Sequence, residues 1–320
     1  MNIGVNDPCV KGPGPEDHAL HRNLELPGAW KKRPIILYDA FTHTTLLPFT
    51  ADTGSATAGG DAHTHKISSS TTGDMAHWIG TNAGTNSLLQ LGSDNPGGVL
   101  TIKAGDEVDS NANAQKGHQM FQLGTGPQTT TDPKPATPLW FETSFSLQIA
   151  SKLGVSFGLH SGYDHTKWDN GAASGAGPTS AGGHVTDGVY FWCDPADTGT
   201  AGTNRLYFIT AENGTNGRSS TTRTVTDTGY DLKADTSDVF AFAYDPVTSD
   251  GTGSTVKAYI NGNLVATHTT TIPDENSDGM GPYFEVGTRV SGVSDNGTMR
   301  LHYVYIRQER EPNTGRSPRA

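Results

Sequence analysis

The chain has 320 residues, a net charge of −11, and 40 Gly, 18 Pro and 42 Thr, whereas only 17% of its residues are charged. Thr favours strands, and Gly and Pro make turns, so this composition excludes coiled coils and helical bundles and favours a β protein. The acidic balance argues against wrapping nucleic acid, which needs clustered Lys and Arg. At 33% hydrophobic residues, the chain can bury one sizeable core.

Residues 1–75 are predicted to form an extended N-terminal arm and a loop. Pro8, Pro13 and Pro15 exclude a helix or a strand interior near the start of the chain. Apolar residues between 30 and 49 follow no sustained period, so this segment needs another surface on which to pack. We predict six assembly contacts in the arm: Trp30, Ile36, Tyr38, Phe41, Leu47 and Phe49. A chain without residues 1–50 is expected to fold and to lose its place in the assembly.

From Trp78 onward the apolar residues change to a period of two. The clearest case is 139–149, and 153–159 repeats the pattern after a short turn. Further strands are predicted at 188–193, 205–210, 222–228, 238–245, 255–260, 263–268, 282–288 and 298–307, and earlier at 98–103 and 118–123. Many short strands separated by turn sequences predict an all-β antiparallel sandwich over residues 76–308, followed by a polar C-terminal tail at 309–320.

Two details of the sandwich can be predicted by residue. The alternating apolar side chains should form the core between two sheets: Phe141, Phe145, Leu147, Val155 and Phe157. Asn261-Gly262 suits a two-residue primed turn, because both residues tolerate positive φ. That turn would set Tyr259 opposite Leu264 and Ala258 opposite Val265.

The cellular setting follows from what the N-terminal sequence contains. Residues 1–8 have neither the basic nor the apolar region of a signal peptide, so we expect synthesis in a cytoplasm. The apolar run 239–244 is too short to span a membrane. Cys9 and Cys193 lie in regions of different character, and we expect no disulfide between them.

Three segments in the last third of the chain carry a family pattern. They are 238–244 (Asp-Val-Phe-Ala-Phe-Ala-Tyr), 255–265 with its Asn-Gly turn, and 301–306 (Leu-His-Tyr-Val-Tyr-Ile). The pattern resembles the concanavalin A-like lectin/glucanase superfamily, particularly the laminin G-like modules of bacteriophage structural proteins. The resemblance covers about 135–308, is plausible from about 78, and implies a jelly roll. It implies no chemistry, because lectins, hydrolases, lyases and virion proteins share this fold.

The carboxylates indicate no catalytic site. Retaining glucanases of this fold carry a Glu-x-Asp-x-x-Glu run that places two carboxyl groups on one strand face. That run does not occur here, and Glu142 and Glu285 stand alone on their strands. The arginine-rich strand and Gln-x-His element of the polysaccharide lyases are also missing. We therefore predict no catalytic residue and no cofactor, with Glu285 at best a carboxylate at a sheet edge.

Other candidate sites are weighed against plainer interpretations. His63 and His65 could share a metal, but two ligands per chain do not close a site, and we predict none. Loop aspartates could hold calcium, although Asp in turns usually bonds its own backbone: Asp94, Asp106, Asp109, Asp164 and Asp169. Trp140 and Trp192 are expected on the outer faces of the sandwich, where aromatic side chains bury a partner more often than they bind sugar. Trp168, in a predicted loop, is the better glycan candidate.

These observations lead to three hypotheses of function. The first is a non-enzymatic bacteriophage virion protein, a capsid decoration (cement) protein that is held by its arm. Its partners would be the major capsid protein, other virion subunits and copies of itself, with no nucleic acid or membrane. Its location would be the virion, assembled in the host cytoplasm. The second is a receptor-recognition or tail protein that binds a host surface glycan. The third is a polysaccharide-degrading enzyme.

Overall fold

A computed structural model describes the strands of the chain and the connections next to them. The described residues are 34–41, 63–64, 78–83, 88–92, 98–105, 111–116, 121, 123, 136–161, 187–195, 204–212, 223–247, 253–273, 279–291 and 297–309. Every regular element within these ranges is a β-strand. Among them there is no helix with the length and hydropathy to cross a membrane.

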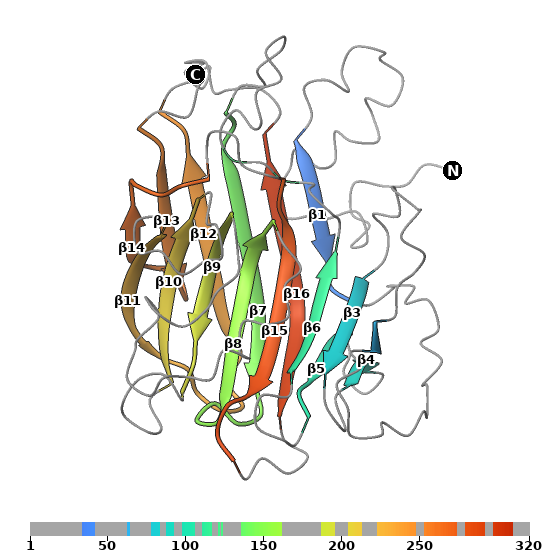
Figure 1. Ribbon diagram of the computed structural model, residues 1–320. Coiled ribbons are helices and arrows are strands. Elements are labelled where there is room, and N and C mark those ends of the chain that lie inside the picture. The colour runs from blue at the N-terminus through green and yellow to red at the C-terminus, as the bar shows by residue number, and fades with distance from the viewer. Residues whose placement is uncertain are drawn as a thin grey trace, which may run out of the picture.

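The strands form two antiparallel sheets of eight strands each, sheet A and sheet B. Sheet A runs in the order β14 (Asn263–His268), β13 (Thr255–Ile260), β12 (Asp238–Asp245), β7 (Leu139–Leu147), β16 (Thr298–Gln308), β5 (Val99–Lys103) and β4 (Leu88–Gly92), and β1 (Ile35–Asp39) also pairs with β16. Sheet B runs in the order β11 (Arg223–Asp231), β10 (Arg205–Ala211), β9 (Gly188–Cys193), β8 (Leu153–His160), β15 (Gly281–Thr288), β6 (Asn111–Lys116), β3 (Trp78–Ala83) and β2 (His63–Thr64). In Figure 1 the two sheets overlie each other, with β14 and β11 at one edge. The predicted antiparallel sandwich is confirmed.

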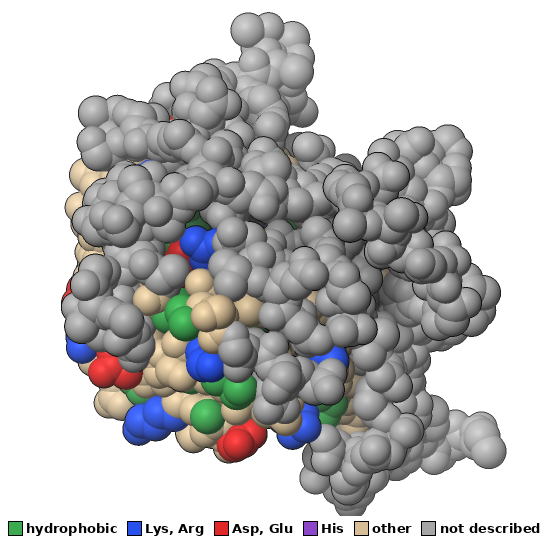
Figure 2. Space-filling model, turned by 60° about the horizontal axis from the view of Figure 1, so that its bottom comes forward, with side chains coloured by type: hydrophobic (Ala, Val, Ile, Leu, Met, Phe, Trp, Pro, Cys, Tyr) green, Lys and Arg blue, Asp and Glu red, His purple; other side chains and the backbone are tan. Residues whose placement is uncertain are grey.

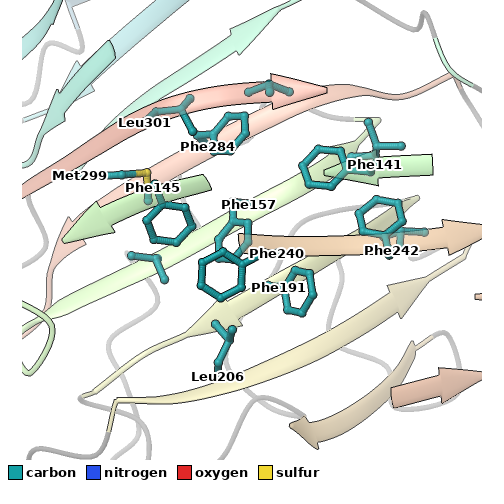
Figure 3. Close-up of a cluster of buried hydrophobic side chains, with 14 of the residues drawn as sticks. Phe141, Phe145, Phe157, Phe191, Leu206, Phe240, Phe242, Phe284, Met299 and Leu301 are labelled. Carbon is teal, nitrogen blue, oxygen red and sulfur yellow. The ribbon is translucent and has the colours of Figure 1, made fainter. Parts of the chain in front are cut away.

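Phenylalanine rings from both sheets fill the space between them. The Phe157 ring of sheet B lies 4.7 Å from Phe145 and 4.9 Å from Phe240, both in sheet A, and 5.2 Å from Phe191 of its own sheet. Figure 3 shows these rings interleaved between the two layers of strands. All five predicted core side chains are buried there. The alternation of apolar residues along β7 and β8 therefore identified the inner faces of both sheets.

The segment 34–41 belongs to the sandwich, which corrects the prediction of an arm up to residue 75. β1 pairs with the C-terminal half of β16, next to the half of that strand that pairs with β5. Leu37 and Phe41 enter the main core. The ring of Phe41 lies 5.5 Å from that of Trp78. Phe41 is thus a contact within its own fold, and its prediction as an assembly contact is wrong.

A buried carboxylate fixes the end of β1. Asp39 accepts hydrogen bonds from the backbone N–H of Phe41 and from the indole N–H of Trp78, both at 2.9 Å. Phe41 adopts a φ of 57°, which is uncommon for a residue other than glycine, and these contacts hold it there. The hydrogen bond between Asp39 and Trp78 therefore connects β1 of sheet A to β3 of sheet B.

The Asn261-Gly262 turn confirms its predicted backbone and corrects half of its register. Both residues have positive φ, 50° and 79°, and Tyr259 lies opposite Leu264. Ala258 pairs with Ala266 instead of Val265, because a bulge interrupts the ladder between Ala258 and Tyr259. Asn261 also donates a 2.9 Å hydrogen bond to Asp238, which joins the turn to β12.

Gly158, in the middle of β8, is required by a close approach of two strands. It has a φ of 150°, and a Cβ at this position would lie 2.4 Å from the carbonyl oxygen of Val189. We expect Gly158→Ala to lower the free energy of unfolding by several kcal/mol, as measured by denaturant titration. Gly229→Ala is the matched control, since Gly229 has a φ of 72° but nothing within 4 Å. Equal losses in the two variants would contradict the steric explanation.

Candidate functional site

The outer face of sheet B carries a cluster of aromatic and ionisable side chains at its centre. The ring of His160 stacks on Tyr283 at 4.5 Å and meets the edge of Tyr190 at 4.7 Å. Tyr283 donates a 3.0 Å hydrogen bond to Glu285. These four side chains, the sheet B cluster, come from β8, β9 and β15, which are adjacent strands in the middle of the sheet.

The sheet B cluster is closed to solvent, although its side chains point away from the core. Glu285 is 0% exposed, and the other three members are also buried. Because β15 lies between β8 and β6, Glu285 is central in its sheet. This corrects the prediction of an edge carboxylate. The buried hydroxyl of Ser156, opposite Glu285 on β8, makes no hydrogen bond among the described residues.

The electrostatics of the sheet B cluster favour a neutral Tyr190. Burial raises the pKa of Tyr190 above its ordinary value, and the nearby Arg223 only partly offsets that effect. A general base must reach a substrate proton within hydrogen-bonding distance, which requires an accessible side chain. The cluster, buried as it is, is better suited to holding three strands together than to acting on a polymer.

The second strand carboxylate, Glu142, lies on the outer face of sheet A. It accepts hydrogen bonds from the Tyr303 hydroxyl at 2.7 Å and the Trp140 indole N–H at 3.2 Å. Partial burial of the phenol raises the pKa of Tyr303, and the hydrogen bond to Glu142 raises it further. Glu142 is thus an organiser of two aromatic side chains, one on its own strand and one on β16.

The two carboxylates cannot act on one glycosidic bond. Glu142 and Glu285 point outward from opposite sheets, and packed sheets lie about 10 Å apart. Their carboxyl groups are therefore more than about 10 Å from each other. Glycosidases place their two carboxyl groups about 5 to 9.5 Å apart. Between these two residues the sandwich forms no acid–base pair.

A row of large side chains crosses the outer face of sheet A. Tyr38 pairs with Tyr305, Tyr305 with Glu142, Glu142 with Ala241, Ala241 with Tyr259, and Tyr259 with Leu264. We call these six residues the sheet A row. Tyr38 and Leu264, at its two ends, are 57% and 56% exposed. The ring of Trp140 lies beside the row, 5.8 Å from that of Tyr259. Tyr38 is the one exposed aromatic side chain among the described residues, and the other rings of the row are half-buried.

His268 of β14, the edge strand of sheet A that also carries Leu264, connects the two sheets. His268 of β14 is 2.9 Å from the Thr210 hydroxyl through Nδ1 and 2.9 Å from the Thr226 hydroxyl through Nε2. Its ring also packs on Phe208 at 4.9 Å. Burial lowers the pKa of His268 to about 4. The neutral imidazole is therefore the form that bridges sheet A to β10 and β11.

The low pKa of His268 predicts a dependence of stability on pH. Because the folded state holds the pKa near 4 and the ordinary value is 6.5, this group contributes full stability above pH 6.5. As the pH falls toward 4 the unfolded chain gains a proton that the folded chain does not. We expect a loss of up to roughly 3 kcal/mol, measured by denaturant unfolding at pH 7 and pH 4.5. His268→Gln should remove this part of the dependence, and an unchanged dependence in the variant would contradict the assignment.

The other predicted site residues are spread over the chain or lie beyond the described part. Ile36 is half-buried in β1, and Tyr38 is exposed beside Tyr305. His63 is in β2, paired with Asn82. Trp192 is on the outer face of sheet B but buried.

Outside the described residues lie Trp30, Leu47, Phe49, His65, Trp168, Cys9 and the five loop aspartates. Cys193 is a buried free thiol, and burial raises its pKa.

The described surface that Figure 2 shows has no patch of charges of one sign. Figure 2 shows the described side chains at one end of the sandwich, where basic, acidic and apolar groups are interspersed. Among the described residues, no three His, Cys, Asp or Glu side chains gather in a way that could hold a metal ion.

Sequence reasoning missed Tyr305 of the sheet A row, the nearby Tyr303 and the partners of His160. A signal for the two tyrosines was present: Tyr303 and Tyr305 alternate with Val304 and Ile306 along β16, which places both rings on the outer face. No comparable signal linked His160 to Tyr283, because strand pairing between β8 and β15 is a contact between distant parts of the chain.

The chain matches no protein-family model and no curated protein sequence. Among solved structures it is similar to the Emp46p carbohydrate recognition domain in its potassium-bound form, at 9% identity and a TM-score of 0.42 over 72% of this chain and 87% of that one. It is also similar to a glycoside hydrolase family 16 endo-glucanase from Bacteroides ovatus (11%, 0.41, 72% and 94%) and to peanut lectin (12%, 0.41, 72% and 97%). These are jelly-roll proteins of the superfamily that the sequence resembles. At this identity the likeness concerns the fold alone.

Proposed function

We propose that the chain is a non-enzymatic structural protein of a bacteriophage virion, a decoration protein on the capsid that is held by its N-terminal residues. The observation that carries the non-enzymatic part is the placement of Glu142 and Glu285 on opposite outer faces. The sheet B cluster, which contains Glu285 and His160, is closed to solvent. Among the described residues, the surface that remains accessible is suited to contact rather than to chemistry.

The anchoring part of the proposal now concerns residues 1–33. β1 and Phe41 pack on the chain's own sandwich and are therefore excluded as anchors. Of the predicted assembly contacts, Trp30 is the one that lies within residues 1–33. The virion assignment itself is supported by the resemblance of the last third of the chain to modules of phage structural proteins. The major capsid protein is the partner that this role implies.

Binding to particles tests this function. Phage particles assembled without the chain should bind the purified full chain to a fixed copy number, measured by quantitative mass spectrometry of purified particles. A chain that starts at residue 34 should keep its fold and lose at least tenfold in occupancy. Full occupancy by the shortened chain would contradict anchoring by residues 1–33. Failure of the full chain to bind any particle would contradict the virion role.

Glycan binding is a second candidate function, and the sheet A row is the observation that favours it. Glu142 of the row holds the polar edges of the neighbouring Tyr303 and Trp140 rings, and such rings suit a ligand with both apolar and hydroxyl surfaces. Titration with neutral oligosaccharides, followed by tryptophan fluorescence, tests this candidate. Binding that Trp140→Ala abolishes would support it, and an unchanged spectrum across the panel would dismiss it.

A further inference from the structure

A polar cluster lies on the outer face of sheet A, beyond the sheet A row. Ser146 of β7 is opposite Arg300 of β16, and Arg300 is opposite Thr101 of β5 on its other side. Across β7, the first residue of β12 pairs with Phe145. Ser237, the residue just before β12, therefore adjoins Ser146, and it is exposed. We call Arg300, Ser146 and Ser237, together with His302, the Arg300 cluster.

His302 connects the two sides of the Arg300 cluster. Its imidazole Nε2 is 3.1 Å from the hydroxyl of Ser237. Because β7 lies between β16 and β12 (Figure 1), these two side chains meet over β7. The side chains of β7 at this place are small, Ser144 and Ser146, and leave room for the ring. A shift of register in β16 makes His302 an extra residue in its ladder with β7, and such bulges redirect a side chain.

Arg300 is the cation of the cluster. Its side chain is exposed and forms no hydrogen bond or ion pair with another residue of the described ranges. Burial and the nearby Arg300 lower the pKa of His302, so the imidazole is neutral at pH 7. The acidic residues closest to Ser237 in the sequence are Asp235, which is exposed, and Asp238. The carboxylate of Asp238 is buried and hydrogen-bonded, so it does not offset the charge of Arg300.

We propose that Arg300, Ser237 and Ser146 bind a tetrahedral oxyanion such as phosphate. Guanidinium and hydroxyl groups are donors that recognise phosphate in proteins, and an arginine without a carboxylate partner keeps all its N–H groups for the ligand. The donors come from β16, from β7 and from the residue before β12, so they approach an anion from different sides. A carboxylate has two oxygens, which the guanidinium alone would occupy, whereas phosphate has further oxygens for the two hydroxyls. The phosphate is either free or esterified to a sugar, and the proposal does not rest on the virion role.

Isothermal titration calorimetry of the full chain at low ionic strength tests this site, with inorganic phosphate, glucose 6-phosphate and glucose as ligands. We expect a phosphate ligand to bind and glucose to give no signal. Arg300→Gln should weaken binding roughly tenfold or more, the loss typical of a hydrogen bond to a charged group. Lys233→Gln is the matched control, because Lys233 is also an exposed cation but lies outside the cluster. It should change the affinity less than about twofold, since salt and water screen distant charges.

His302 supplies a second readout, which a general loss of positive charge would not move. A phosphate bound beside the ring should raise the pKa of His302, followed by NMR of the histidine ring signals with and without the ligand. Tighter binding of glucose 6-phosphate would assign the site to a phosphorylated sugar, and tighter binding of inorganic phosphate to the free ion. The proposal is overturned if neither phosphate binds, if the Arg300 and Lys233 variants weaken binding equally, or if the pKa of His302 stays unchanged. None of these results affects the particle-binding test of the virion role.

Discussion

Replacing Asp194 by Ala should lower the free energy of unfolding by about 3–5 kcal/mol, as measured by denaturant titration. Asp194 follows β9 and meets the Nε of Arg289, which follows β15, at 3.0 and 3.1 Å. Both side chains are buried. The substitution would leave the guanidinium charge in a low-dielectric environment without the carboxylate that offsets its desolvation.

A double variant separates the cost of an uncompensated charge from the value of the pair. Asp194→Leu combined with Arg289→Met removes both charges and keeps much of the volume. We expect this variant to recover most of the stability, because buried ion pairs can often be replaced by apolar residues at little cost. If the double variant is as unstable as Asp194→Ala, the two residues act through packing or other hydrogen bonds, and the charge argument is wrong.

Removal of β1 should have an effect of similar size. A chain that starts at residue 42 loses Leu37 and Phe41 from the core and the carboxylate of Asp39 from Trp78. Burial of a Leu or Phe side chain contributes about 1.5–3 kcal/mol, so the two together contribute about 3–6 kcal/mol. Truncation also opens the backbone of β16 over the residues that β1 covers. We expect a large fall in the denaturant midpoint and poor solubility.

The chain that starts at residue 34 is the control for this truncation, because it keeps β1. It should unfold at nearly the same denaturant concentration as the full chain. This expectation replaces the one drawn from composition, under which residues 1–50 could be removed without harm. Equal stability of the chains starting at residues 34 and 42 would show that β1 contributes little to the fold.

The sequence predicted the strands whose pattern is local. Along β7 and β8, bulky apolar residues alternate with small or polar ones, so their period could be read directly. The same holds for β12, β13 and β14, where the Asn261-Gly262 turn marks the hairpin. Each of these features depends on neighbours within a few residues.

Other strands gave no such local pattern. β6 has the sequence Asn-Ala-Asn-Ala-Gln-Lys, and its inward residues Ala112 and Ala114 are too small to mark a buried face. It becomes a strand because β15 and β3 pair with it on both sides. β1 has adjacent apolar residues without a period, and its partner β16 lies at the other end of the chain. Pairing between distant segments overrode weak local propensity in both cases.

The candidate surfaces were harder to foresee than the strands. The face of each outward residue followed from alternation, so Trp140 and Trp192 were placed correctly. Their accessibility did not follow, because Trp192 is buried and Trp140 is half-buried. The sheet A row joins residues from six strands, and its order depends on the sheet topology. A single strand sequence contains no information about that order.

The most direct test of the account is a turnover assay with the full chain. The purified protein is incubated with a panel of bacterial polysaccharides, alongside Glu142→Gln and Glu285→Gln variants, and reducing ends and unsaturated products are quantified. The placement of the two carboxylates on opposite faces predicts no turnover by any of the three proteins. Turnover by the unaltered chain that either variant abolishes would contradict the account and identify the protein as an enzyme.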